Sequence, residues 1–184
     1  MKKMLALALC ACVVSFTGLQ AQNLLKNASF EKWESDKSHP DQWRGSVGKE
    51  APVYQVSSDA QEGAQSIRIT YKQEKPSDNC QLLLRNPLTL TAGEYDFEAF
   101  FKGKGEVRYI NLILQVEGKS SKKPEDNIRA YADRKPVKID EAAWKSRKAT
   151  FTVPADGKYY FKMAFNNGSE ETPFLMDNLT LKKK

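Results

Sequence analysis

The sequence is poor in the two residue types that most often carry nucleophilic and metal chemistry. Its 184 residues include three cysteines and one histidine, and Cys10 and Cys12 lie in the apolar N-terminal run. Cys80 then has no partner for an intramolecular disulfide, and its apolar neighbours favour a small buried residue on a strand. His39 lies in a polar loop. This scarcity argues against a Cys–His nucleophile, a Ser-His-Asp triad and a histidine-rich zinc site.

A strong excess of one charge is also missing. The chain has 29 basic and 23 acidic residues, and its formal net charge of +6 falls to +4 without Lys2 and Lys3. Nucleic-acid binding calls for basic residues clustered on one face or helix, whereas here they alternate with acids. We therefore expect no nucleic-acid partner.

No apolar run is long enough to cross a bilayer, which needs about 20 residues. The run Leu5–Phe16 follows Lys2 and Lys3, and the small residue Ala21 ends the segment. This is the layout of a secretory signal peptide. We expect cleavage after Ala21, a secreted protein without a transmembrane segment, and a single domain over residues 22–184. A lipoprotein signal at Cys10 or Cys12 is the alternative, but the residues before both cysteines match it weakly.

Helical periodicity is almost absent, and period-two alternation replaces it. Tyr95, Phe97, Ala99 and Phe101 alternate with Glu94, Asp96, Glu98 and Phe100. Such alternation, with turn signals at short intervals, predicts an all-β sandwich or barrel. We expect Gly103 and Gly105 to break the chain, residues 118–134 to form a long loop, and Asp140–Trp144 to be one helical turn. The other candidate strands are Val53–Val56, Ser66–Tyr71, Gln81–Leu84, Leu88–Leu90, Val107–Val116, Ala149–Val153, Tyr159–Phe165 and Phe174–Leu181.

Five motifs in order resemble one family over nearly all of residues 22–184. Asn23–Glu31 is similar to an "N-L-hydrophobic-x-N-x-x-F-E" opening, and Pro40–Trp43 to a following "P-x-x-W". The other three are Glu62–Ile69 ("G-x-x-S-L-x-hydrophobic"), Trp144 with Ala149–Pro154 ("W…F-T-V-P") and Phe174–Leu181 ("hydrophobic-D-D/N-V-x-L"). The chain thus resembles carbohydrate-binding modules of the family four and nine type. That resemblance implies a galactose-binding-like jelly roll, a β-sandwich of two antiparallel sheets.

The three tryptophans have separate interpretations. Trp43 and Trp144 lie next to a loop and before a strand, where packing in the core or at the sandwich edge is expected. Trp33 lies among charged residues. It is either a lid over the sandwich edge or an exposed platform for stacking a sugar ring.

One strand offers a sugar-binding face. If Ile110, Leu112, Leu114 and Val116 face the core, then Tyr109, Asn111, Ile113 and Gln115 face outward. An aromatic ring stacks on the C–H face of a sugar, and amides bind its hydroxyls. The same rule turns Glu98, Phe100, Arg68, Tyr160 and Lys162 outward. We take Tyr109, Asn111, Gln115, Arg68, Glu98 and Trp33 as candidate ligand-binding residues; an ordinary solvated sheet is the alternative.

The resemblance also implies a structural calcium ion. Glu31 and Asp177 match the positions of its carboxylates near the first and last strands. Calcium takes six to eight oxygen ligands, so main-chain carbonyls near Gln65 and Ser66 would supply the rest. Glu31 and Asp177 as ordinary carboxylates without an ion are the alternative.

Catalysis has little support, because no motif singles out the opposed pair of carboxylates that a glycosidase needs. The first hypothesis is therefore a secreted, non-catalytic carbohydrate-binding domain. The second is a structural or adhesive β-sandwich of a bacterial surface complex, whose partner is a protein.

Overall fold

A computed structural model describes residues 22–35, 39–46, 54–70, 80–114, 129–133, 135–166 and 174–184. These residues form strands, turns and loops, as the alternating pattern predicts, and they contain no helix that could span a membrane. The strands are β1 (Trp43–Ser46), β2 (Tyr54–Ser57), β3 (Ser66–Ile69), β4 (Cys80–Leu84), β5 (Leu88–Leu90), β6 (Gly93–Leu114), β7 (Arg129–Asp133), β8 (Val137–Val153), β9 (Gly157–Asn166) and β10 (Phe174–Lys183).

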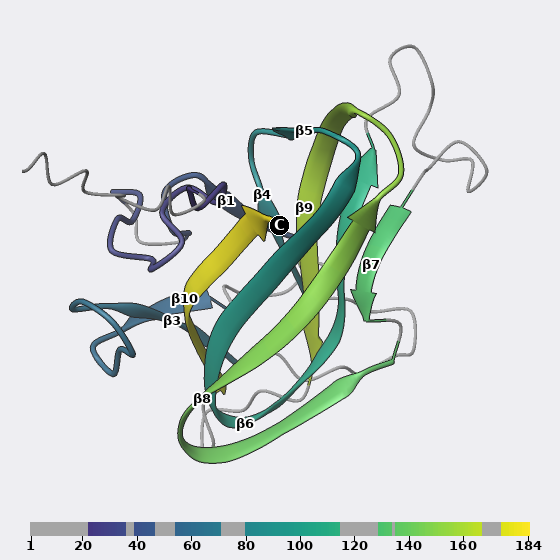
Figure 1. The fold of residues 1–184 in the computed structure, drawn as a ribbon. Coiled ribbons are helices and arrows are strands. Elements are labelled where there is room, and N and C mark those ends of the chain that lie inside the picture. Colours follow the sequence, from purple (N-terminus) through teal and green to yellow (C-terminus); the bar gives the residue numbers. More distant parts are fainter. Residues whose placement is uncertain are drawn as a thin grey trace, which may run out of the picture.

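The strands form two antiparallel layers that β6 joins (Figure 1). The first half of β6 pairs with β8 and β10, and β3 and β2 continue from β10. The second half of β6 pairs with β9 and β7, and β4 and β1 continue from β9, with β5 beside it. We call these the β10 layer and the β9 layer. Because β6 belongs to both, all strands form one connected sheet folded on itself, which is the predicted jelly-roll sandwich.

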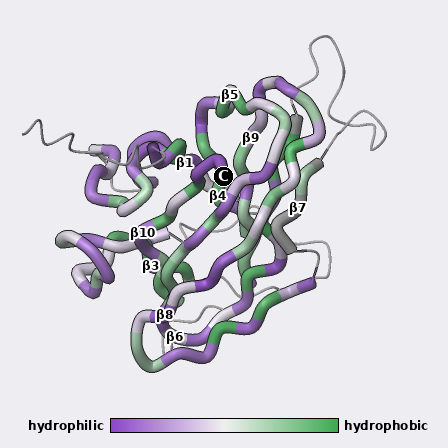
Figure 2. The backbone as a smooth tube through the Cα atoms, in the orientation of Figure 1, coloured by the Kyte–Doolittle hydropathy of each residue, from purple (hydrophilic) through white to green (hydrophobic). Residues whose placement is uncertain are grey.

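The core lies between the layers and is rich in aromatic rings. Phe97 of the β10 layer lies 5.6 Å from Phe161 of the β9 layer, and Phe161 lies 5.9 Å from Trp43, between ring centroids. All three are almost fully buried. Such ring pairs contribute about 0.5–1.5 kcal/mol each beyond the burial of their area. Trp43 is thus a core residue, as expected, and hydrophobic residues alternate with hydrophilic ones along the strands (Figure 2).

The two ends of the described chain are joined. The Asn23 side chain donates to the Leu179 carbonyl and accepts from the Leu181 N–H, at 2.8 and 3.0 Å. The backbone N–H of Leu24 donates to the Leu181 carbonyl at 2.9 Å. These bonds fix the N-terminal segment along β10, and this position brings Glu31 close to Asp177.

Three details of the sequence interpretation are wrong. Asp140–Trp144 is part of β8 and not a helical turn, because residues 137–141 pair with β6. Gly103 and Gly105 do not end a strand; β6 continues through them from one layer to the other. Gly103 has φ 91°, and a Cβ on Gly105 would lie 2.7 Å from the Phe174 ring, so this crossing requires glycine. Within the expected loop 118–134, residues 129–133 form β7.

Candidate functional site

The predicted phase of β6 is confirmed where the structure describes it. Ile110 and Leu112 are buried in the core, so Tyr109, Asn111 and Ile113 belong to the opposite face. A β-bulge between Val107 and Tyr109 precedes them. Gln115, the fourth predicted member, lies outside the described residues.

Strand register shows what surrounds these side chains. Asn111 is in register with Lys162 of β9, Lys162 with Leu83 of β4, and Leu83 with Arg44 of β1. Asn111 is also in register with Tyr131 of β7 on its other side. Registered residues in antiparallel strands share a face, so these five form one row across the layer. The next row joins Tyr109, Ala164 and Gln81, and the row on the other side joins Ile113 and Tyr160. We call these three rows the β9 face.

Tyr109 and Lys162 are held together on this face. The Lys162 ammonium nitrogen lies 5.8 Å from the centre of the Tyr109 ring, within the range of a cation–π interaction. Both side chains are half-buried. The contact limits the motion of the ring and places a positive charge beside it.

Asn111 is the unusual residue of the β9 face. It points away from the core, yet only 2% of its surface is exposed. Its Oδ1 atom is buried and accepts no hydrogen bond. A buried acceptor without a donor costs about 1–3 kcal/mol. A ligand that displaces what covers Oδ1 and donates a hydrogen bond to it, as a sugar hydroxyl can, would relieve this cost.

The structure does not bring Arg68 and Glu98 to this site. Both lie on the outer face of the β10 layer, where Arg68 donates to Gln55 Oε1 at 3.3 Å and Glu98 pairs with Lys148 at 3.6 Å. Glu98 also lines a shallow hollow of about 380 Å³ over β6, β8 and β10. Period two gives the face within a strand but not the layer, and that is why the sequence could not separate these residues from Tyr109 and Asn111.

Trp33 is placed as a lid over the sandwich edge. Its indole N–H donates to the Phe30 carbonyl at 2.7 Å, and its backbone forms an isolated bridge with Pro40. The ring is half-buried against the core. Of its two interpretations, the structure supports packing more than sugar stacking.

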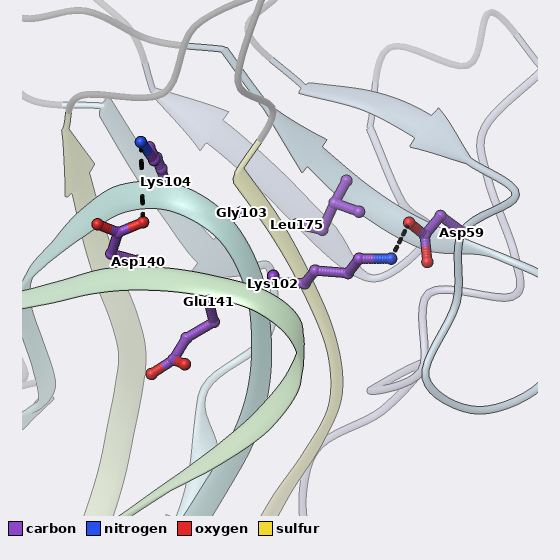
Figure 3. A pocket seen from close by; sticks show the side chains of 8 residues that line it. Asp59, Lys102, Gly103, Lys104, Asp140, Glu141 and Leu175 are labelled. Carbon is purple, nitrogen blue, oxygen red and sulfur yellow. Dashed lines mark hydrogen bonds and ion pairs between the residues drawn. The ribbon is translucent and has the colours of Figure 1, made fainter.

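A second pocket, of about 310 Å³, lies where β6 crosses between the layers (Figure 3). Lys102 pairs with Asp59 at 2.6 Å on one side, and Lys104 faces Asp140 at 3.9 Å on the other. The Trp144 indole N–H donates to Asp59 at 3.1 Å. The charges lining this pocket thus have partners already. Trp144 is half-buried at this edge of the sandwich, and no motif in the sequence predicts its contact with Asp59.

Glu31 and Asp177 face the same loop, as the calcium interpretation requires. Asp177 is fully buried, and its Oδ2 accepts from the N–H groups of Gln61 and Glu62 at 2.8 and 3.1 Å. Glu31 Oε1 accepts from Ala64 and Gln65 at 2.9 and 3.0 Å. Burial raises the pKa of Asp177, backbone N–H bonds oppose the rise, and the Glu31 charge adds to it.

This carboxylate pair fits a calcium ion in charge but not in number of ligands. Asp177 is buried and Glu31 is half-buried, and a cation bound between them would offset the repulsion of the two carboxylates. The described residues contain no group of three or more acidic, histidine or cysteine side chains that could hold a metal. Glu31 and Asp177 would therefore hold calcium only together with main-chain oxygens, and calcium binding stays a prediction.

Cys80 and Tyr54 form a buried pair inside the core. The Tyr54 hydroxyl lies 3.1 Å from the Cys80 sulfur, and Cys80 has no exposed surface. Burial raises the pKa of the thiol to about 12, although the bond to Tyr54 opposes the rise. A thiol so far from ionisation is a poor nucleophile.

Comparison with known proteins identifies the family. A family model described as a carbohydrate binding domain matches residues 22–172, and the chain belongs to this family. No curated protein matches the chain. The fold is similar to that of TmCBM61 in complex with β-1,4-galactotriose, with 18% identity, a TM-score of 0.55, and coverage of 89% of this chain and 100% of that one.

Two further solved structures show how widely the fold is used. The CBM22-1 xylan-binding domain from Paenibacillus barcinonensis Xyn10C is 11% identical, with a TM-score of 0.58 over 89% of this chain and 95% of that one. The K2 cleaved adhesin domain of Lys-gingipain is 12% identical, with a TM-score of 0.53 over 85% of this chain and 97% of that one. At such identities the likeness establishes the fold alone.

Proposed function

We propose that this protein is a secreted, non-catalytic domain that binds a glycan on the β9 face. The family supports a carbohydrate ligand. The observation that carries the location is the buried, unpaired Oδ1 of Asn111 beside the Tyr109 ring. The ring packs on a sugar while the amide oxygen accepts a hydrogen bond from a hydroxyl. Small-molecule sites commonly combine aromatic packing with a few hydrogen-bonding groups in this way.

The adhesive alternative has its own support. The adhesin domain of Lys-gingipain has the same fold at a similar level of likeness to the xylan-binding domain. The fold therefore does not distinguish a protein partner from a sugar ligand. The half-buried cation–π pair and the unpaired amide favour the sugar, because they suit a small polyhydroxylated ligand better than a broad protein contact.

A glycan array followed by two aromatic variants tests the proposal. We expect the purified protein to bind a subset of glycans, and Tyr109→Ala to lose most of that binding. Because Tyr109 is half-buried and faces away from the core, its truncation is expected to cost about 1 kcal/mol of stability or less.

Trp144→Ala is the matched control, since it removes an aromatic ring beside the other pocket. Full glycan binding by Tyr109→Ala, with loss in Trp144→Ala, would move the site to the pocket where β6 crosses between layers. An array without any bound glycan would favour the adhesive alternative.

A further inference from the structure

The charge of the β9 face points to a particular class of glycan. Arg44 and Lys162 lie in its central row, and none of the residues in register along its three rows is acidic. These rows contain Arg44, Leu83, Lys162, Asn111, Tyr131, Ser46, Gln81, Ala164, Tyr109, Tyr160, Ile113 and Arg129. Asp133 of β7 is in register with Ile110, between the rows of Tyr109 and Asn111. Glu106 lies on the same side of the layer, but it is beyond the bulge and in register with Lys138 of β8. The opposite face, over the β10 layer, mixes both signs: Glu94, Asp96 and Glu98 pair with Lys184 and Lys148.

We propose that the β9 face binds an acidic glycan, a polysaccharide carrying carboxylate or sulfate groups. This inference rests on the proposed function and adds the chemical class of the ligand. The central row supplies one acceptor and two cations in a line. Asn111 Oδ1 needs a hydrogen-bond donor, which a hydroxyl offers and an ionised carboxylate does not. Lys162 and Arg44 offer only donors and positive charge.

The spacing of the row suits a chain of sugars. Neighbouring strands lie about 4.8 Å apart, so Lys162 is one strand from Asn111 and Arg44 is about 10 Å from Lys162, across β4. A sugar beside Tyr109 and the Lys162 ammonium that lies over its ring would bring an acidic group near Lys162 and a hydroxyl toward Asn111. Arg44, which is exposed, meets the acidic group of a following sugar.

The two cations differ in how strongly they contribute. Lys162 is half-buried and fixed over the Tyr109 ring, whereas Arg44 is exposed to solvent. Salt screens exposed charges within about 10 Å at 0.1 M. Loss of Lys162 is therefore expected to weaken binding more than loss of Arg44, and added salt to weaken mainly the Arg44 contribution.

Polygalacturonate and its fully methyl-esterified form provide the sharpest test, because they share a sugar backbone and differ in charge. We expect the protein to bind polygalacturonate at least about tenfold more tightly, with Lys162→Gln raising its Kd by about tenfold and Arg44→Gln by about threefold. Dextran sulfate against dextran is the second pair and separates sulfate from carboxylate as the source of charge. A preference for the charged polymer within either pair supports the inference.

Lys148→Gln is the matched control, since it removes one positive charge from an exposed side chain over the other layer. If Lys148→Gln and Lys162→Gln lost the same affinity for polygalacturonate, the proposed site would be refuted, because the affinity would then depend only on the net charge of the protein. Binding of polyglutamate as tight as that of polygalacturonate would overturn it as well. If neutral glycans bind equally and depend on Tyr109 but not on Lys162, the acidic ligand is refuted and the proposed function stands. If no glycan binds, both fall.

Discussion

Replacement of Asn111 by valine is expected to make the protein more stable and less able to bind its ligand. The side chain is 2% exposed, and its Oδ1 accepts no hydrogen bond. Removing such an acceptor recovers about 1–3 kcal/mol of desolvation cost, and the different shape of the branched valine side chain offsets part of that gain. Valine also suits a strand and a buried site. The net gain is about 1 kcal/mol, or about 2–4 °C in Tm for a domain of this size.

Urea unfolding of the wild type and Asn111→Val measures this gain, since a changed midpoint at constant slope reports stability alone. Gln81→Val is the control on the same face: its side chain is half-exposed, so its stability should change little. Glycan binding by Asn111→Val should fall, because the sugar hydroxyl that would donate a hydrogen bond to Oδ1 loses its acceptor. A destabilised Asn111→Val would refute the reasoning, since it would mean that the amide makes structural hydrogen bonds in the unliganded protein.

Three other predictions concern the rest of the chain. The exported protein should begin at or near Gln22, which N-terminal sequencing checks; a lipid-bearing start at Cys12 would contradict it. Cys80 should resist a thiol reagent in native protein and react fully in denaturant, because burial raises its pKa to about 12 and removes it from solvent; rapid native labelling would refute this. A calcium chelator should lower Tm, and Glu31→Gln should remove most of that response while keeping an acceptor for the Ala64 and Gln65 N–H groups. Equal Tm with and without chelator in the wild type would leave Glu31 and Asp177 as ordinary carboxylates.

The sequence predicted those features that depend on neighbours along a strand. The alternation of Ile110 and Leu112 with Tyr109 and Asn111 gives the buried and outward faces directly, because side chains in a strand alternate. The five ordered motifs gave the family, which the match over residues 22–172 confirms. Alternation within a strand and the order of motifs along the chain can both be read without knowing which strands pair.

Features that depend on pairing between distant strands could not be predicted in this way. Arg44 is assigned to the β9 face only by the register of β1 with β4 and of β4 with β9, which the sequence does not show. Arg68 and Glu98 do not belong to the β9 face, because β3 and the first half of β6 belong to the β10 layer. The two glycines that signal a turn in a short window instead allow β6 to bend from one layer into the other.

The pH dependence of stability offers a way to separate the two states of the carboxylate pair. In the absence of calcium, the folded pKa of Asp177 is raised above its unfolded value, so the folded protein binds a proton more readily. The stability that Asp177 contributes is then fully present below the unfolded pKa near 3.8 and is lost as pH rises through the folded pKa. Bound calcium would reverse this sign, since it would bind the ionised carboxylate and compete with the proton. In chelator, lowering the pH through this window should raise the stability of the folded protein, because the buried Asp177 carboxylate becomes protonated. In excess calcium, the same change should lower the stability, because protonation of Asp177 would release the ion. A comparison of Tm against pH in the two buffers checks this, with Glu31→Gln expected to bring the curves together. Parallel curves for the wild type would show that no calcium binds at Asp177.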